Sequence, residues 1–285
     1  MQRADWNGQS GERWAANQTR LDQILSAFGE ATIDAAAPLR GEIVLDIGCG
    51  AGASSFALAD RVGPQGHVRG VDISEPLILR ARELTPAGAP VAFELADAAR
   101  TSLAEGAFDL LFSRFGVMFF DDPAGAFAHL RRALTPGGRL AFVCWREAKE
   151  NDWVRLPMGA IKAIVPPPSP PDPEAPGPFS LGDRERIFRI LGAAGFVDIV
   201  VTPFDGTIPF GMGETRAAAI ENALEMAFEV GPLSRALADQ PEAIRTRAAD
   251  AVRAAFAERP GDRAVMIDGA AWIVTARNPA DIPPS

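Results

Sequence analysis

One unit in the first third of the chain limits its fold more than any other feature. Residues 43–47 form an apolar run rich in branched side chains, Gly48-Cys49-Gly50-Ala51-Gly52 interrupts it, and residues 54–61 have a helix-compatible composition. A second branched run, residues 68–71, ends on Asp72. This order predicts a right-handed βαβ crossover with a carboxylate at the tip of its second strand.

The glycine turn of this unit predicts a ligand site. Gly48, Gly50 and Gly52 let the backbone turn sharply and let a ligand approach the main chain without a Cβ in between. The helix behind them directs its free N–H groups at the same point. Asp72 can accept hydrogen bonds from both hydroxyls of a ribose. We therefore expect a ligand that carries an adenosine end.

Two cofactor classes use such a unit. Gly48, Gly50 and Ala53 satisfy the dinucleotide pattern Gly-x-Gly-x-x-Gly/Ala, which would fit an NAD-dependent oxidoreductase. Asp46, inside the first strand, favours the other class, because a buried acid suits a cofactor ending in an ammonium group and would repel a pyrophosphate. The oxidoreductase stays an alternative, although no residue set for hydride transfer is found.

Two segments carry a resemblance to a known family. Residues 44–52, Val-Leu-Asp-Ile-Gly-Cys-Gly-Ala-Gly, resemble the first motif of class I S-adenosylmethionine-dependent methyltransferases. Residues 134–140, with a Pro-Gly-Gly turn leading into a strand, provide a second match. The chain looks most like the small-molecule methyltransferases of ubiquinone and menaquinone biosynthesis, specifically over residues 44–145 and only in topology over residues 180–277.

The resemblance implies an α/β fold, with a doubly wound Rossmann-like sheet of seven strands in the order 3-2-1-4-5-7-6. The last strand is antiparallel, and helical cap insertions are added. The implied domains are an N-terminal helical lid (residues 1–40), a cofactor-binding core (41–148), a helix and Pro-rich connection (149–179), and the rest of the sheet (180–285) with a helical cap at about 213–259. A dimer interface is the plainer alternative for this insertion.

Several elements outside the first unit are expected from periodicity and turn residues. The lid should hold a helix from about residue 19 and a second short helix ending before Pro38. A helix capped by Asp122 should use Leu134 on its inner face, and another should run from Ser180 to Leu191. The last two strands are expected at residues 197–201 and 270–276, and the Pro-rich segment 166–178 should be extended and exposed.

The resemblance also implies cofactor contacts. In this family an acid after the third strand meets the adenine amino group and the next backbone N–H meets the ring, and Asp97 and Ala98 occupy these positions. A helix N-cap is the plain alternative for Asp97. The full set of expected cofactor-binding residues is Asp46, Gly48, Cys49, Gly50, Gly52, Asp72, Ile73, Asp97, Ala98 and Ser113.

The acceptor site is expected at the carboxyl ends of the fourth and fifth strands. The expected contributors are mainly apolar and aromatic: Trp14, Arg114, Phe115, Met118, Trp145 and Arg146, with Phe119 and Met212 as further candidates. Such a lining favours a small, mainly apolar acceptor, methylated at carbon or oxygen. Arg114 and Arg146 could bind an acidic or phenolate acceptor, and a salt bridge to a nearby acid is the plainer alternative for each. No catalytic residue is assigned, because neither His67 nor His129 lies at the expected edge.

The composition limits the partners and the compartment. A net charge of −9 argues against nucleic acid, and no apolar run approaches the length of a membrane span. The two cysteines, Cys49 and Cys144, suggest reduced thiols, so we expect a cytoplasmic protein. We expect no bound metal and a small-molecule partner. The protein could form a homodimer. A non-catalytic cofactor-binding protein stays a further alternative, because a blocked acceptor pocket has no sequence motif.

Overall fold

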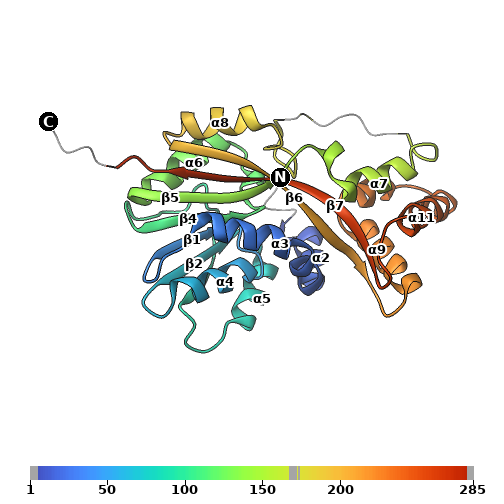
Figure 1. Cartoon of the computed structure of the whole chain (residues 1–285), viewed down its shortest axis with the longest axis horizontal. Helices are drawn as coiled ribbons and strands as arrows, with labels where there is room; N and C mark the ends of the chain where they lie inside the picture. Colours follow the sequence, from blue (N-terminus) through green and yellow to red (C-terminus); the bar gives the residue numbers. More distant parts are fainter. Residues whose placement is uncertain (1–5, 167–171, 173, 281–285) are drawn as a thin grey trace.

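The computed structural model describes residues 6–166, 172 and 174–280. Seven strands form one sheet in the order β3-β2-β1-β4-β5-β7-β6, as predicted (Figure 1). The strands are β1 (Ile43–Ile47), β2 (His67–Asp72), β3 (Val91–Leu95), β4 (Phe108–Arg114), β5 (Leu134–Trp145), β6 (Val197–Met212) and β7 (Ala264–Arg277). β1 to β5 are parallel, and β7 is antiparallel to both of its neighbours.

The first βαβ unit has the predicted form. β1 pairs in parallel with β2 from Ile43↔His67 to Ile47↔Val71, so both strands end at the same edge of the sheet. Between them lies α4 (Ala53–Val62), and α5 (Glu75–Leu84) follows β2. Val44 and Leu45 are fully buried, because helices cover both faces of the sheet.

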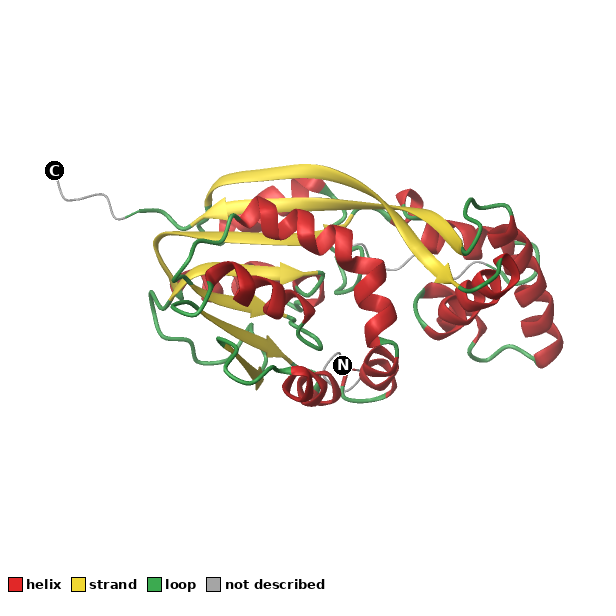
Figure 2. Cartoon of the chain, turned by 60° about the horizontal axis from the view of Figure 1, so that its bottom comes forward, coloured by secondary structure: helices red, strands yellow, loops and turns green. Residues whose placement is uncertain are grey.

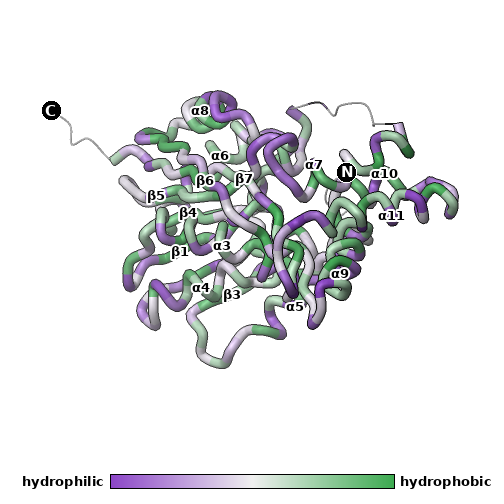
Figure 3. The backbone as a smooth tube through the Cα atoms, turned by 45° about the vertical axis from the view of Figure 1, so that its right-hand side comes forward, coloured by the Kyte–Doolittle hydropathy of each residue, from purple (hydrophilic) through white to green (hydrophobic). Residues whose placement is uncertain are grey.

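Two hydrophobic clusters hold the helical layers on the sheet. One cluster joins α4, α5 and the C-terminal end of α3 (Gln18–Ala36) to β1 and β2. The other contains the inner faces of α6 (Pro123–Arg132) and α8 (Arg184–Ala193). Apolar residues accordingly dominate the central strands in Figure 3. The sheet is thus covered on both sides and leaves its carboxyl edge for a site.

Some element boundaries differ from the predictions. α6 begins as expected, because Asp122 Oδ1 accepts the Gly125 N–H at 3.0 Å. Leu134 is not on its inner face but is the first residue of β5, which includes the Pro-Gly-Gly segment and shifts register against β4 there. α8 begins at Arg184 rather than Ser180, because Asp183 accepts the Glu185 N–H and caps the helix.

The N-terminal helices and the Pro-rich connection also differ from the predictions. Instead of two helices after residue 19, one continuous helix, α3, follows α2 (Gln9–Ala16). Residues 167–171 and 173 of the Pro-rich segment lie outside the described residues, and residues 174–178 form turns and bends instead of the extended, exposed chain that was expected. After it, the Gly177 N–H and the Ser180 hydroxyl both donate to Met118 O, which ties the chain back to the core.

The last two strands are much longer than predicted. β6 and β7 continue past the end of the neighbouring strands as a two-stranded ribbon, with pairs from Phe204↔Ala271 to Met212↔Ala264 (Figure 2). Four helices gather at its far end: α7 (Asp152–Ala160), α9 (Arg216–Glu229), α10 (Pro232–Leu237) and α11 (Glu242–Ala257). The chain between α9 and α10 turns at Gly231-Pro232, and the chain between α10 and α11 turns at Gln240-Pro241. We call these four helices the helical lobe. In the described ranges, no helix combines the length and hydrophobicity that crossing a bilayer requires.

Candidate functional site

A cavity of about 890 Å³ opens at the carboxyl edge of the sheet, where the sequence predicts the site. Its floor is the glycine turn after β1 together with the ends of β2 and β4, and its cover is α2 and the first turns of α3. The volume lies in the upper part of the range of about 300–1,000 Å³ that is usual for ligand pockets. Among the predicted residues, the following line it: Gly48, Cys49, Gly50, Asp72, Ile73, Asp97, Ala98, Trp14, Arg114, Phe115 and Phe119.

The glycine turn is held against two neighbouring strands. The N–H groups of Gly48 and Cys49 donate to Val71 O at 2.9 and 3.1 Å. Gly48 has a φ of +67°, and a Cβ there would lie 2.8 Å from the Cα of Gly116. Only glycine meets both conditions, since a side chain would be strained and would collide with backbone. The close approach of these two glycines brings the turn after β1 next to the tip of β4.

Asp72 lies at the tip of β2, beside the glycine turn. Its Oδ2 accepts the Gly50 N–H and its Oδ1 accepts the Ser74 N–H, both at 2.8 Å. Burial raises the pKa of this carboxyl group, although these backbone donors act in the opposite direction. The carboxylate is therefore fixed in position, and its remaining lone pairs can accept hydroxyl groups from a ligand in the cavity.

Asp46 lies beneath the turn and does not line the cavity. Its Oδ2 accepts the hydroxyls of Ser54 and Ser55, at 2.7 and 2.6 Å, at the start of α4. Its Oδ1 is buried without a hydrogen-bond partner in the described part of the chain. Burial raises its pKa from 3.8 to about 6. Asp46 therefore cannot touch a ligand in the cavity and could influence one only through the electric field of its charge.

Asp97 and Ala98 line the opposite end of the cavity from the N-terminal helices. Asp97 Oδ1 accepts the Ala99 N–H at 3.0 Å, and Oδ2 lies 3.7 Å from Arg100 Nε. Asp97 therefore caps a turn, a role similar to the helix N-cap that was the alternative expected for it. Its side chain is 38% exposed, so it is also open to a ligand.

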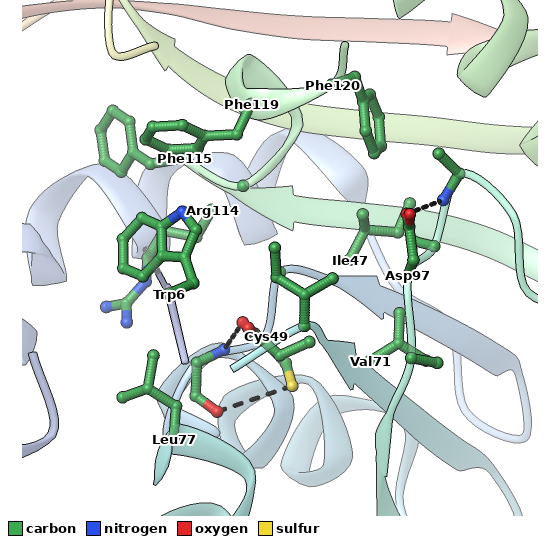
Figure 4. Close-up of a pocket in the computed structure, with 18 of the residues that line it drawn as sticks. Trp6, Ile47, Cys49, Val71, Leu77, Asp97, Arg114, Phe115, Phe119 and Phe120 are labelled. Carbon is green, nitrogen blue, oxygen red and sulfur yellow. Dashed lines mark hydrogen bonds between the residues drawn. The ribbon is translucent and has the colours of Figure 1, made fainter. Parts of the chain in front are cut away.

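Aromatic side chains form the wall at the other end. Trp6 is in edge contact with Trp14 and Phe119, at ring-centroid distances of 5.6 and 5.5 Å. Phe115, whose φ is +59°, stacks on Trp145 at 4.2 Å. Figure 4 shows Trp6, Phe115 and Arg114 on one side of the cavity and Asp97 on the other. The cavity therefore has a polar end built on strand tips and an aromatic end under the N-terminal helices.

Three predicted acceptor residues lie outside the cavity lining. Met118 is buried, and its sulfur accepts the Trp145 N–H at 3.4 Å. Trp145 supports Phe115 from behind. Arg146 forms ion pairs with Glu150 and Asp205 and lies over Trp272, which is the plainer alternative expected for it.

Three further candidates also lie outside it. Gly52 precedes α4 with a φ of +93° and lies against Phe93. Ser113 is buried, and its hydroxyl donates to Ile47 O at 2.7 Å, which fixes β4 to β1. Met212 is exposed on the far part of the ribbon. The side chain of Ser113 faces away because successive residues of a strand point to opposite faces, and its neighbour Arg114 is the one that lines the cavity.

Sequence reasoning missed the contribution of α3. Gln18, Leu21, Asp22 and Leu25 all line the cavity, at spacings that place them on one face of the helix. The polar members of this set interrupt an apolar stripe, which was the available signal. Asp22 Oδ1 pairs with Arg114 Nη2 at 2.7 Å, so the plainer alternative expected for Arg114 also occurs. Neither His67 nor His129 lines the cavity.

The helical lobe does not line the cavity with any described residue. It contacts the N-terminal helices instead. Arg20 of α3 donates to Phe210 O at 3.0 Å and to Asn222 O, and Asn17 donates to Glu229 Oε2 at 2.8 Å. The helices that cover the cavity therefore rest on the lobe, whose own position as a cap stays a prediction.

The cavity fits S-adenosylmethionine on three observations. Asp72 offers a fixed carboxylate where a ribose is expected, and the glycine turn leaves open space at Gly50, where an added Cβ would meet nothing within 4 Å. Asp46 adds a buried acid below the turn, which favours a cation and disfavours a pyrophosphate. No hydride-transfer set was found to favour the NAD alternative.

Comparisons with known proteins agree with this geometry. Residues 44–138 match the family model described as a methyltransferase domain. Aklanonic acid methyltransferase DauC of Streptomyces sp. strain C5 is 34% identical over 148 residues, covering 50% of this chain and 67% of the relative. The 2-methyl-6-phytyl-1,4-hydroquinone methyltransferase of Synechocystis is 30% identical over 197 residues, covering 67% and 57%. The chain thus spans between about half and two thirds of the length of these relatives.

A solved structure shares the fold. A putative methyltransferase from Bacillus halodurans superimposes with a TM-score of 0.54 at 21% identity, covering 88% of this chain and 98% of that one. This chain therefore belongs to the class I S-adenosylmethionine-dependent methyltransferases, and its cofactor is S-adenosylmethionine.

Proposed function

We propose that this protein transfers a methyl group from S-adenosylmethionine to a small, mainly apolar acceptor, at a carbon or an oxygen atom. The observation that carries the proposal is the division of one cavity into a polar end at the strand tips and an aromatic end under α2 and α3. The two relatives described above are named for acceptors of this small-molecule kind. A macromolecular acceptor would need an open face at the aromatic end, where Trp6 and Trp14 lie.

The proposed cofactor contacts follow the cavity lining. Asp72 would hold the ribose, Asp97 and Ala98 the adenine, and Gly48 to Gly50 would pass beneath the methionine part. Gly52 and Ser113 would act from outside the lining by shaping the turn and the tip of β4.

The chain's own contribution to the reaction is alignment and exclusion of water. When bound, S-adenosylmethionine supplies an already activated methyl group. The aromatic wall orients the acceptor toward the centre of the cavity, and α2 and α3 shield it from solvent. Such positioning can supply about 7–11 kcal/mol of a barrier without a fixed catalytic base. Cys49 is no candidate for a nucleophile, because burial and nearby acids raise the pKa of its thiol.

The proposal extends to partners and compartment. The net charge of −9 supports a protein that does not bind nucleic acid. The two free, buried cysteines support a cytoplasmic location. Val197 and Val200 are exposed on the edge strand β6, and this exposed apolar edge supports the expected homodimer.

Thermal unfolding with S-adenosylmethionine, S-adenosylhomocysteine and NAD in parallel tests the proposed cofactor. Ligand at 100 times its dissociation constant should stabilise the protein by about 2.7 kcal/mol, a shift of several degrees. Transfer of labelled methyl groups to a small-molecule extract, and not to protein or nucleic acid, is then expected. A shift with NAD alone, or label only in a macromolecule, would overturn the proposal, and binding of both sulfur compounds with no transfer would favour the non-catalytic alternative.

A further inference from the structure

One polar group interrupts the aromatic end of the cavity. Gln18 and Asp22 of α3 and Arg114 at the tip of β4 all line this end, among Trp14, Leu21 and other apolar side chains. Asp22 accepts from Arg114 through Oδ1 and from Gln18 through Oδ2. We call Gln18, Asp22 and Arg114 the polar trio.

The fold makes room for this trio. The side chains of Arg114 and Asp22 are only 14% and 23% exposed, so the ion pair is largely removed from bulk water. The stem of Arg114 passes over Gly29, where a Cβ would lie 3.1 Å from Arg114 Cδ. Gly29 is seven residues after Asp22 and therefore lies on the same face of α3. A side chain at position 29 would therefore press on the stem of Arg114 and shift it.

The trio keeps unused hydrogen-bonding capacity. Arg114 Nε and Nη1 make no hydrogen bond to the described residues, and the same holds for the amide oxygen of Gln18. Each carboxylate oxygen of Asp22 can accept a further hydrogen bond. Donors and acceptors thus stand side by side, while the charges of Arg114 and Asp22 cancel.

The rest of the lining disfavours an anionic acceptor. Acidic side chains outnumber the basic ones, since Arg100 is the other arginine and the acids include Asp72, Glu94, Asp97, Asp121 and Asp122. An acceptor with a negative charge would meet both this excess and a guanidinium that is already neutralised. A neutral substrate that carries a hydrogen-bond donor beside a hydrogen-bond acceptor avoids this repulsion and does not need an unpaired guanidinium.

We propose that the polar trio recognises a neutral acceptor in which a hydroxyl group stands beside a carbonyl group on an apolar skeleton. Arg114 donates to the carbonyl oxygen, and Asp22 accepts from the hydroxyl. This inference rests on the proposed function, and it makes Arg114 and Asp22 the residues that choose the acceptor.

Three naphthalene derivatives of similar size provide the probes. In 2-hydroxy-1-(2-naphthyl)ethanone the hydroxyl stands on the carbon beside the carbonyl and is free to donate outward, in its isomer 6-hydroxy-2-acetonaphthone the two are far apart, and 2-acetonaphthone has no hydroxyl. Their binding to the full chain saturated with S-adenosylhomocysteine is measured by calorimetry. The first should bind at least tenfold more tightly than the other two. Equal binding of the three, or no binding of any to the loaded protein, overturns the proposal.

Variants locate the preference. Arg114→Met and Asp22→Asn should each reduce the tenfold preference to less than threefold, while the affinity for S-adenosylhomocysteine changes less than twofold. Arg146→Met is the matched control, because this arginine stands at the tip of the next strand, is also paired with acids and lies outside the lining. It should keep the preference. Unfolding temperatures of all variants identify any that is not folded, and Asp22→Asn keeps the test valid if Arg114→Met fails.

Two further outcomes separate the hypotheses. If Arg114→Met keeps the preference but loses tenfold or more in affinity for S-adenosylhomocysteine, the guanidinium binds the carboxylate of the cofactor, and the acceptor proposal is overturned. If the unmodified protein binds neither S-adenosylmethionine nor S-adenosylhomocysteine, the proposed function itself fails.

Discussion

The two ends of the cavity are built from different parts of the chain. At the polar end, which we propose binds the cofactor and call the cofactor end, backbone groups and short residues on three strand tips form the surface. The contact of Gly48 with Gly116 is an example. At the aromatic end, which we propose binds the acceptor and call the acceptor end, large side chains form the surface. They come from the segment before α2, from α2 and α3, and from the segment after β4, as with Trp6 and Phe119. A backbone surface tolerates few substitutions, whereas a side-chain surface can change its shape without a change of fold. One fold can therefore keep a cofactor while its acceptors differ.

The largest effect should come from the backbone contact at the cofactor end. Gly48→Ala places a Cβ 2.8 Å from Gly116 Cα at a φ of +67°. Left-handed strain of about 1–2 kcal/mol and overlap of about 1–3 kcal/mol should together destabilise the protein by about 2–5 kcal/mol. Chemical denaturation measures this loss, and titration with S-adenosylmethionine should show weakened binding.

Gly50→Ala is the matched control for this contact. Gly50 also has a positive φ, +55°, but a Cβ there meets nothing within 4 Å. Only the strain of about 1–2 kcal/mol should remain. Equal losses for the two variants would show that the approach of the turn to β4 does not matter, and the contrast between the two ends would lose its main support.

Next comes the loss of the carboxylate at the tip of β2. Asp72→Ala should weaken binding of S-adenosylmethionine by about 2–4 kcal/mol, because two charge-assisted hydrogen bonds to the ribose are removed. Asp72→Asn separates charge from shape, since it keeps the volume beside Gly50 and Ser74. Calorimetric titration gives both affinities. Unchanged affinity in both variants would mean that the ribose is not held there.

The acid beneath the turn should be visible in the pH dependence of stability. Burial raises the pKa of Asp46 from 3.8 in its ordinary state to about 6 in the folded protein. The folded state therefore holds its proton more tightly than the unfolded state. Its contribution to stability is fully present below about pH 4 and is lost as the pH rises through about 6, a change of about 3 kcal/mol.

Comparison with Asp46→Asn isolates this effect. The amide cannot ionise, so the unfolding free energy of the variant minus that of the unmodified protein should increase by about 3 kcal/mol between pH 4 and pH 7. Asp60→Asn, at an exposed position of α4, should show no such trend. A flat difference for Asp46→Asn would mean that its pKa is ordinary and that the turn carries no buried charge.

The same contrast explains what the sequence could predict. The glycine turn and Asp72 followed from short local patterns, because a glycine turn between two strands determines its own geometry, whereas the strand order and the positions of Asp97 and Ala98 followed from the family resemblance. Asp22 escaped prediction, since its role depends on Arg114, 92 residues away. The length of the β6 and β7 ribbon escaped for a related reason. The helical lobe packs against the extended part of the ribbon, and alternation alone does not mark that contact.

The smallest effect is expected where the two ends meet. Ser74 directly precedes α5, but its hydroxyl donates to Trp6 O at 2.8 Å and does not cap the helix. This bond joins Trp6 of the aromatic end to Ser74, two residues after Asp72, so it links the two ends of the cavity. Ser74→Ala should remove about 1 kcal/mol, and S-adenosylmethionine should dissociate about five times faster. Stopped-flow displacement measures that rate, with Ser26→Ala on the exposed side of α3 as control. An unchanged rate would show that the cover opens without releasing this bond, and the two ends would then behave as independent surfaces.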